Sequence, residues 1–169
     1  MLALKVTGLV VTGGAILGIT RQAGFPYRQR VRVLEEWERA LARLVPLIGW
    51  RHLPLKDACR LAVKGLPMIG PYWLRMVASL DDREVDFLTA FNTMVDHLPG
   101  LWAEDRPVLQ EVGRLLGQSA AVYQEALLAR GLADVSRLLE EARQQSQSDG
   151  RVMPALVGAV GALLLILLL

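Results

Sequence analysis

The sequence has little of the chemistry that metal sites, disulfides and nucleotide hydrolysis require. Its 169 residues include a single cysteine, Cys59, which excludes an internal disulfide and fits a reducing compartment. The two histidines, His52 and His97, are far apart and have no Cys or second His at the spacing of zinc ligands. No G-x-x-x-x-G-K-[ST] motif is present, so the chain does not hydrolyse ATP through a phosphate-binding loop. We therefore predict no metal and no cofactor.

Strand signals are also missing from the middle of the chain. Between Gln22 and Arg151 no segment alternates cleanly between apolar and polar residues, and the only hairpin-type dipeptide is Asp149-Gly150. Apolar residues recur instead at the three- and four-residue spacing of helices. This pattern predicts an all-α fold.

Massed charge of one sign is absent as well. Nineteen Lys and Arg residues are interspersed with seventeen Asp and Glu residues, for a net charge of +2, so we expect no nucleic-acid partner. Hydrophobic residues make up 53% of the chain and the mean hydropathy is +0.33, which is high for a soluble domain of this size. The excess lies at the two ends.

Both ends have the composition of membrane-spanning helices. Residues 2–20 contain one charge, Lys5, and residues 152–169 contain none. A helix of ~18 to 20 residues rises about 27 to 30 Å, enough to cross a bilayer. A cleaved signal peptide is the alternative for the first segment, which lacks a small-x-small cleavage site, and a buried core helix is the alternative for the second, which lacks a polar face. We predict an N-terminal transmembrane helix over 1–22, a helical bundle over 23–151 and a C-terminal transmembrane helix over 152–169.

The flanking charges predict the orientation. Basic residues follow the first segment and precede the second, namely Arg21, Arg28, Arg30, Arg32, Arg143 and Arg151. The positive-inside rule therefore places the bundle in the cytoplasm and both chain ends outside. Gly14 and Gly18 have the G-x-x-x-G spacing that lets membrane helices pack closely, which is compatible with a homo-oligomer; chance is the alternative in so glycine-rich a segment.

The bundle is expected to contain about six helices with antiparallel neighbours. The first has an apolar stripe of Val33, Leu34, Trp37, Leu41, Leu44, Val45 and Ile48, opposite a polar face of Arg32, Glu35, Glu36, Arg39 and Arg43, and Pro46 should kink or end it. Helices follow over about 55–65 and 71–80, and Ser79 with Asp82 is expected to cap the next, which carries Val85 to Val95. The segment EDRPVLQEVGRLLG (104–117) begins with acids and an early proline, as helices do.

The longest helix is expected from Ser119 towards Ser146. It has an a/d-type seam of Leu128, Leu132, Val135, Leu139 and Ala142, and QQSQSDG (144–150) is predicted to be a polar hinge. Trp37, Trp50, Trp73 and Trp102 form either an interface set or, for at least two of them, part of the core.

Ser119 is the one candidate nucleophile. A nucleophile elbow needs a strand before the serine and glycine two residues after it, but here a helix precedes Ser119 and Ala121 follows it. Gly117 fits the end of one helix and Ser119 the N-cap of the next. We interpret the segment as a helix–turn–helix corner and predict that the protein is not an enzyme.

The corner and the ends together resemble the stage III sporulation protein AB family. The residues that carry the resemblance are VGRLLGQS (112–119), Gln124, EDR (104–106), LPLKDA (53–58) and GALLLILLL at the end. The sequence departs from the family pattern at Ala120, Ala121 and Val122, where charged residues are usual.

This resemblance implies a location and a role. It implies a protein of the mother-cell membrane around the forespore, with a bundle similar to the cytoplasmic domains of type II secretion and type IV pilus platform proteins. The implied partners are a cytosolic secretion-type ATPase, stage III sporulation protein AA, and other membrane proteins of the channel complex. The candidate partner-binding residues are Glu104, Asp105, Arg114, Gly117, Ser119 and Gln124. The alternative from another functional class is a small signalling or regulatory membrane protein whose bundle senses a ligand.

Overall fold

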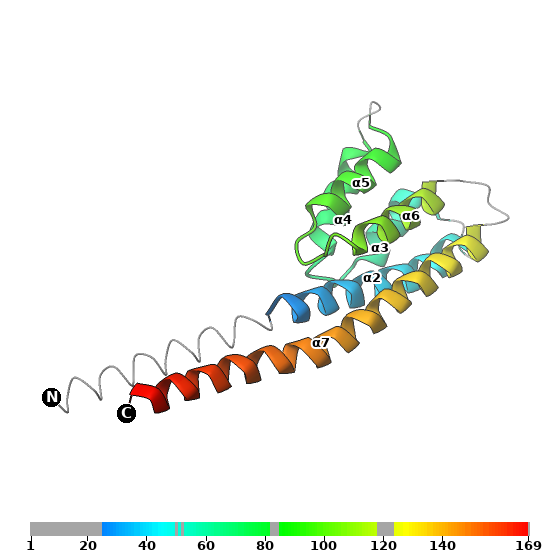
Figure 1. The fold of residues 1–169 in the computed structure, drawn as a ribbon. Coiled ribbons are helices and arrows are strands. Elements are labelled where there is room, and N and C mark those ends of the chain that lie inside the picture. The colour runs from blue at the N-terminus through cyan, green and yellow to red at the C-terminus, as the bar shows by residue number, and fades with distance from the viewer. Residues whose placement is uncertain (1–24, 50, 52, 82–84, 118–123, 169) are drawn as a thin grey trace. The chain divides into compact units, whose positions relative to one another are not determined.

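The computed structural model describes residues 25–49, 51, 53–81, 85–117 and 124–168. These residues contain six α-helices and no strand, which confirms the all-α prediction (Figure 1). The helices are α2 (Phe25–Gly49), α3 (Leu55–Ala62), α4 (Gly70–Ser79), α5 (Phe87–His97), α6 (Asp105–Gly117) and α7 (Gln124–Leu168).

The chain divides into two compact units. The larger one, Arg30–Glu141, contains α3 to α6 and parts of α2 and α7. The other includes the described residues 25–29 and 142–168, and α7 remains helical through the latter. Within the described part of the chain, no helix combines the length and apolarity needed to cross a bilayer. The predicted first span, 1–22, lies outside the described residues.

Two predicted interruptions are instead helical. Helix α2 continues through Pro46 to Gly49, so the helix does not end at the proline. The N–H groups of Arg51 and Leu53 donate to the carbonyls of Pro46 and Leu47 (3.3 and 3.2 Å). These two carbonyls in the last turn of α2 therefore have hydrogen-bond partners. The predicted polar hinge at 144–150 is wrong, because α7 runs through it as a helix. There the Ser148 hydroxyl donates to the Gln144 carbonyl within the helix (3.1 Å).

The N-cap of α5 differs from the prediction. Asp86 occupies this position, and its carboxylate accepts hydrogen bonds from the Leu88 and Thr89 N–H groups (3.1 and 3.4 Å). The Ser79 hydroxyl instead donates to the Met76 carbonyl at the end of α4 (2.7 Å). The predicted cap at Ser79 is therefore wrong, and Asp82 lies outside the described residues.

The core of the larger unit is built around three aromatic rings. Trp37 of α2, Trp73 of α4 and Phe91 of α5 pack edge to face, with centroids 5.0 to 5.8 Å apart. All three side chains are fully buried. Such edge-to-face pairs contribute about 0.5 to 1.5 kcal/mol each beyond area burial. The expectation that at least two tryptophans belong to the core is confirmed, while Trp50 lies outside the described residues.

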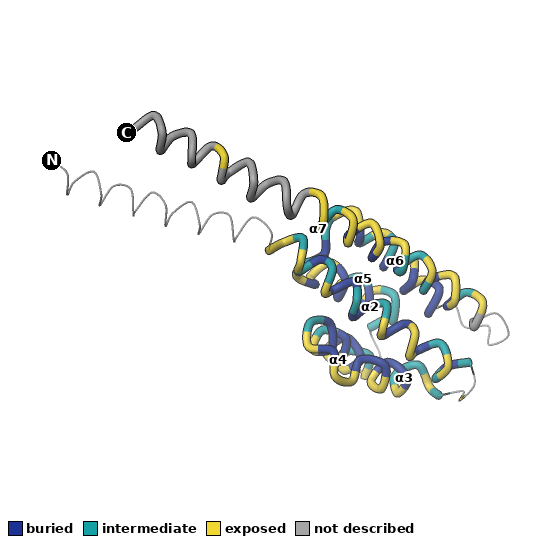
Figure 2. The backbone as a smooth tube through the Cα atoms, turned by 90° about the horizontal axis from the view of Figure 1, so that it is seen from below, coloured by how far each residue is buried: buried dark blue, intermediate teal, exposed yellow. Residues whose placement is uncertain are grey.

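Two glycines let α6 approach its neighbours closely. An added Cβ at Gly113 would lie 2.6 Å from Cε1 of Phe91, and one at Gly131 of α7 would lie 3.3 Å from Cγ2 of Val112. The predicted seam of α7 is confirmed, since Leu128, Val135, Leu139 and Ala142 are buried and Leu132 is half-buried. Figure 2 shows the buried and exposed residues alternating along these helices.

The sequence pattern suggested that the polar face of α2 is exposed, but part of it is buried. Glu36 is only 7% exposed, and its carboxylate accepts the N–H groups of Met68 and Ile69 at the start of α4 (2.8 and 3.0 Å). Arg43 of the same helix donates to the carbonyls of Ala62 and Lys64 at the end of α3 (3.2 and 2.8 Å). Side chains of α2 therefore bond to backbone groups at the end of α3 and the start of α4. These are the carbonyl and N–H groups that a helix end leaves without partners inside the helix.

Candidate docking surface

The N-terminal end of α6 is held by a buried ion pair. The Arg30 guanidinium donates to both Asp105 carboxylate oxygens, from Nη2 to Oδ1 (2.6 Å) and from Nε to Oδ2 (2.9 Å). Asp105 also accepts the Trp102 N–H (2.9 Å), and the Arg30 guanidinium lies 4.3 Å from the Trp102 ring centroid. Both charged side chains are almost completely buried. Asp105 is therefore engaged inside the protein, with no exposed side-chain surface.

Glu104 has a different environment from its neighbour Asp105. Its side chain is 60% exposed and forms an ion pair with Arg30 (3.1 Å). The carboxylate is accessible at this end of α6, but it shares its cation with the buried Asp105. Because the pair is half in solvent, its contribution to stability is small.

The C-terminal end of α6 carries the other described candidates. Arg114 is exposed and donates from Nε to Oε2 of Glu111 (2.7 Å), an interaction that lowers the pKa of the Glu111 carboxyl. Gly117 ends α6, as predicted, and an added Cβ there would lie 3.3 Å from Cδ1 of Phe87. Ser119 lies outside the described residues, so its capping role stays a prediction. Gln124 begins α7, and its side chain is outside the described part.

The described candidates lie at opposite ends of α6. Helix α6 has thirteen residues, Asp105 begins it and Gly117 ends it. At 1.5 Å per residue, about 18 Å of helix separates the two ends. Glu104 and Asp105 therefore lie at the Arg30 end, away from Arg114 and Gly117.

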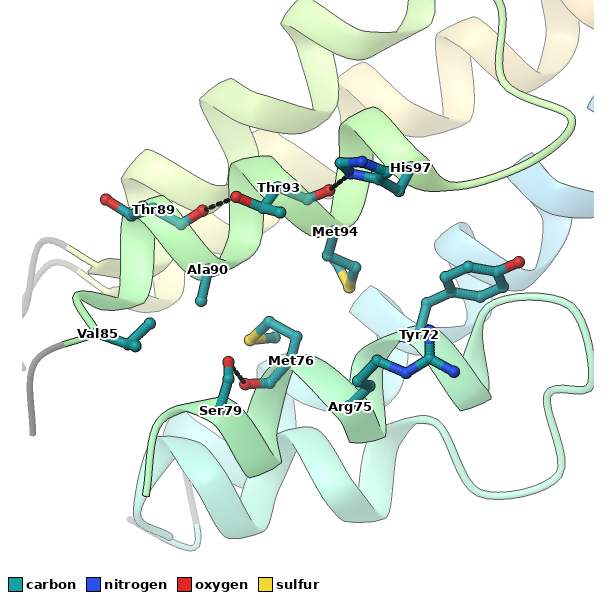
Figure 3. A pocket seen from close by; sticks show the side chains of 10 residues that line it. All are labelled: Tyr72, Arg75, Met76, Ser79, Val85, Thr89, Ala90, Thr93, Met94 and His97. Atoms are coloured by element: carbon teal, nitrogen blue, oxygen red, sulfur yellow. Dashed lines mark hydrogen bonds between the residues drawn. The ribbon is translucent and has the colours of Figure 1, made fainter. Parts of the chain in front are cut away.

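The structure contains a groove between α4 and α5 that the sequence did not predict. We call it the α4–α5 groove; it has a volume of about 450 Å³ (Figure 3). Its lining residues are Tyr72, Arg75, Met76 and Ser79 of α4, Val85, and Thr89, Ala90, Thr93, Met94 and His97 of α5. The sequence carried one usable signal, the methionines on two adjacent helices, but only the packing of α4 on α5 brings them together.

Three polar side chains of the groove, Ser79, Thr93 and His97, are bonded within their own helices. The Thr93 hydroxyl donates to the Thr89 carbonyl (2.8 Å), and His97 donates from Nδ1 to the Thr93 carbonyl (2.8 Å), as the dashed lines in Figure 3 show. The base of the groove is apolar, since Met76, Ala90 and Met94 are buried there. The arrangement suits an apolar group better than a small polar ligand.

The described residues contain no metal-binding cluster. None of their His, Cys, Asp and Glu side chains form a group of three or more that could hold a metal ion. Cys59 is buried, and burial raises the pKa of its thiol to about 12. A thiol in this state is a poor nucleophile at neutral pH, because the thiolate is the reactive form.

Comparison with known families identifies the family of this chain. A family model described as stage III sporulation protein AB matches residues 5–169. The chain belongs to the stage III sporulation protein AB family. The resemblance inferred from VGRLLGQS and the apolar ends is thereby confirmed. No curated protein and no solved structure matches the chain. In this stage III sporulation protein AB family member, the matched residues include both ends of α6 and the whole α4–α5 groove.

Proposed function

We propose that this protein is a non-catalytic, membrane-anchored component of the channel complex between mother cell and forespore, and that it docks a cytosolic secretion-type ATPase. Membership of the family implies a role in stage III of sporulation. The single observation that carries the finer proposal is the extent of the match, which covers 5–169 and so includes both apolar ends as well as the helical unit.

The sequence of the two ends supports the anchoring. Residues 152–169 contain no charge and residues 2–20 contain only Lys5, a composition that supports membrane anchoring. With basic residues on the inner flanks, the helical unit faces the cytoplasm and the ends lie in the mother-cell membrane around the forespore. Anchoring at both ends restricts the unit to the membrane surface and raises its effective concentration towards other membrane proteins of the complex.

The interior of the helical unit supports a binding role rather than catalysis. Two buried carboxylates among its described residues, Glu36 and Asp105, accept hydrogen bonds from backbone N–H groups, and Asp105 also pairs with Arg30. Groups used in this way hold helices together and are not available as general acids or bases. Exposed side chains on α4 to α6 then provide the contacts with a partner.

A ligand-sensing role is the second candidate. The volume of the α4–α5 groove, about 450 Å³, is within the range of small-molecule sites. The Ser79 and Thr93 hydroxyls of the groove, however, already donate to carbonyls of their own helices. The adaptor role therefore has the stronger support.

The test is direct binding between purified partners. Full-length protein in phospholipid nanodiscs is mixed with the ATPase stage III sporulation protein AA, and the complex is measured by size-exclusion chromatography with light scattering. The adaptor proposal expects a defined complex and no ATP hydrolysis by the nanodisc protein alone. Absence of a complex with a correctly folded protein contradicts ATPase docking.

A paired variant locates the surface. Arg114→Glu reverses a charge at the C-terminal end of α6, and Arg137→Glu reverses an exposed charge on α7 as the matched control. If the corner binds the ATPase, only Arg114→Glu weakens the complex. Equal binding by both variants leaves docking in place and removes the corner from the interface.

A further inference from the structure

We propose that the α4–α5 groove is a docking site for an acidic, amphipathic helical segment of a protein partner. The inference is independent of whether that partner is an ATPase, because it rests on the shape, lining and charge of the groove. The groove lies wholly within the compact unit Arg30–Glu141.

The dimensions of the groove fit a short helix. Its two walls, α4 and α5, have ten and eleven residues. At 1.5 Å per residue they are about 15 and 16 Å long, which corresponds to about three turns of a docked helix. A helix laid in such a groove inserts apolar residues spaced three and four apart. The volume of about 450 Å³ has room for a few such side chains.

The base of the groove is adaptable and apolar. Met76 and Met94 extend into it from opposite helices, and Ala90 lies beside them (Figure 3). Methionine is unbranched and polarisable, so it adjusts to apolar side chains of different shapes. Because the Thr93 and Ser79 hydroxyls already donate within their helices, inserted apolar groups do not displace these bonds.

The charge of the groove selects the partner. Arg75 is exposed and is the only Arg or Lys among the ten lining residues, none of which is Asp or Glu. Its guanidinium lies 6.0 Å from the Tyr72 ring centroid, a weak contact that leaves the group able to turn to a carboxylate. Arg is suited to bidentate pairing with a carboxylate. The segment that fits therefore carries Glu or Asp beside its apolar residues.

A concave surface with one cation favours a protein over a membrane. Peripheral membrane binding uses protruding apolar residues with several Lys and Arg side chains around them. Here the apolar residues are recessed, with Met76 and Met94 only 4% and 6% exposed. A helix that projects side chains into the groove matches this surface, and the flat surface of a bilayer does not.

The experiment is selection from a random peptide library displayed on phage, with full-length protein in phosphatidylcholine nanodiscs as bait. Each enriched sequence is synthesised, and its affinity is measured by fluorescence anisotropy. Four proteins are compared: the wild type, Arg75→Glu, Arg75→Lys and the exposed control Arg137→Glu. Thr93→Trp, which fills the groove from its exposed rim, is a second and independent block. Thermal unfolding shows that each variant is folded.

The proposal expects enriched peptides with apolar residues three or four apart and adjacent acids. Arg75→Glu and Thr93→Trp should each weaken their binding by about tenfold or more. Arg75→Lys, which keeps the charge without the bidentate geometry, should weaken it less than Arg75→Glu, and Arg137→Glu should leave it unchanged. Enrichment of basic or uncharged sequences, equal binding by Arg75→Glu, or no enrichment would overturn it. Arg75-dependent binding of phosphatidylglycerol vesicles, without peptide enrichment, would assign the groove to a membrane and also overturn it.

Discussion

Arg30 and Asp105, 75 positions apart in the sequence, form a buried ion pair with contacts of 2.6 and 2.9 Å. The pair joins α2 to the N-terminal end of α6. Because both side chains are almost fully buried, each charge depends on the other for the interactions that water would otherwise supply. This relationship makes Asp105 a residue of the fold, although its sequence position suggested an accessible partner contact.

Replacing Asp105 with alanine should destabilise the protein strongly. The change removes the buried carboxylate that pairs with the Arg30 guanidinium and accepts the Trp102 N–H, so we expect a loss of about 3 to 5 kcal/mol in the free energy of unfolding. Urea unfolding in detergent, followed by tryptophan fluorescence, measures it. Glu104→Ala is the matched control, and its exposed pair with Arg30 should account for less than about 1 kcal/mol. Equal losses for the two variants would contradict the assignment of Asp105 as the structural partner.

Removing the Glu36 carboxylate should destabilise the start of α4. Glu36→Ala leaves the buried Ile69 N–H without its acceptor, which corresponds to a loss of about 1 to 3 kcal/mol. Glu36→Gln keeps an oxygen in place and should lose less. Glu141→Ala, at an exposed position on α7, is the control and should be nearly neutral. Hydrogen exchange at the Met68 and Ile69 amides provides the local readout, and unchanged exchange in Glu36→Ala would refute the capping role.

A methyl group at Gly113 should disturb the aromatic core. Its Cβ would lie 2.6 Å from Cε1 of Phe91, whose ring is fixed between Trp37 and Trp73. We expect Gly113→Ala to lower the midpoint of thermal unfolding, because overpacking costs about 1 to 3 kcal/mol and exceeds the gain in helix propensity.

Gly131 is the matched control for this substitution. It also lies inside a helix, but its added Cβ would meet Val112 at 3.3 Å, so Gly131→Ala should be tolerated better. Gly113→Ala combined with Phe91→Leu should recover part of the loss by removing the ring. A stable Gly113→Ala single variant would show that α5 and α6 are not so closely packed.

Cys59 should be unreactive in the folded protein at neutral pH. Burial raises the pKa of its thiol from 9.0 to about 12, so the folded state disfavours the thiolate. A thiol-specific reagent at pH 8 should label the protein slowly until it is unfolded, and then react fully. Rapid labelling without denaturant would be inconsistent with the buried position.

The same shift gives a pH dependence of stability with a definite sign. The stabilisation linked to Cys59 is fully present below pH 9, where the thiol is neutral in both states. It is lost as the pH rises from about 9 towards 12, because the unfolded chain then releases the proton first. Cys59→Ala should remove this component of the alkaline loss, and the difference between its unfolding curves and those of the wild type over this range measures it.

The sequence predicted the local elements well where the apolar pattern was regular. The stripe from Val33 to Ile48 gave α2, and the seam from Leu128 to Ala142 gave the first half of α7. Helix ends were less well predicted, because several local signals compete there. Asp86 caps α5 in place of Ser79, and the polar residues of 144–150 remain helical.

The candidate surface was predictable only in part. Gly117 was correctly placed at the end of a helix, since a glycine after an apolar repeat commonly ends one. Glu36 was placed on the polar face of its helix and Arg30 among the charges that flank the first apolar segment, yet both are buried by partners from distant parts of the sequence. The helical periodicity of α2 does not indicate which of its charged residues bond to a helix end or to a carboxylate elsewhere in the chain.

The sequence by itself determined the all-α class and the apolar character of the two ends, because composition and helical periodicity are properties of short segments. The family was indicated by specific motifs such as VGRLLGQS and shown by the match over residues 5–169. Only the tertiary structure decided that Asp105 is internal, that Glu36 supports α4, and that Met76 and Met94 share a groove beside Arg75. The physical reason is that burial and pairing depend on which helices pack together. That packing is set by contacts between residues far apart in the chain, such as Trp37 with Trp73 and Phe91.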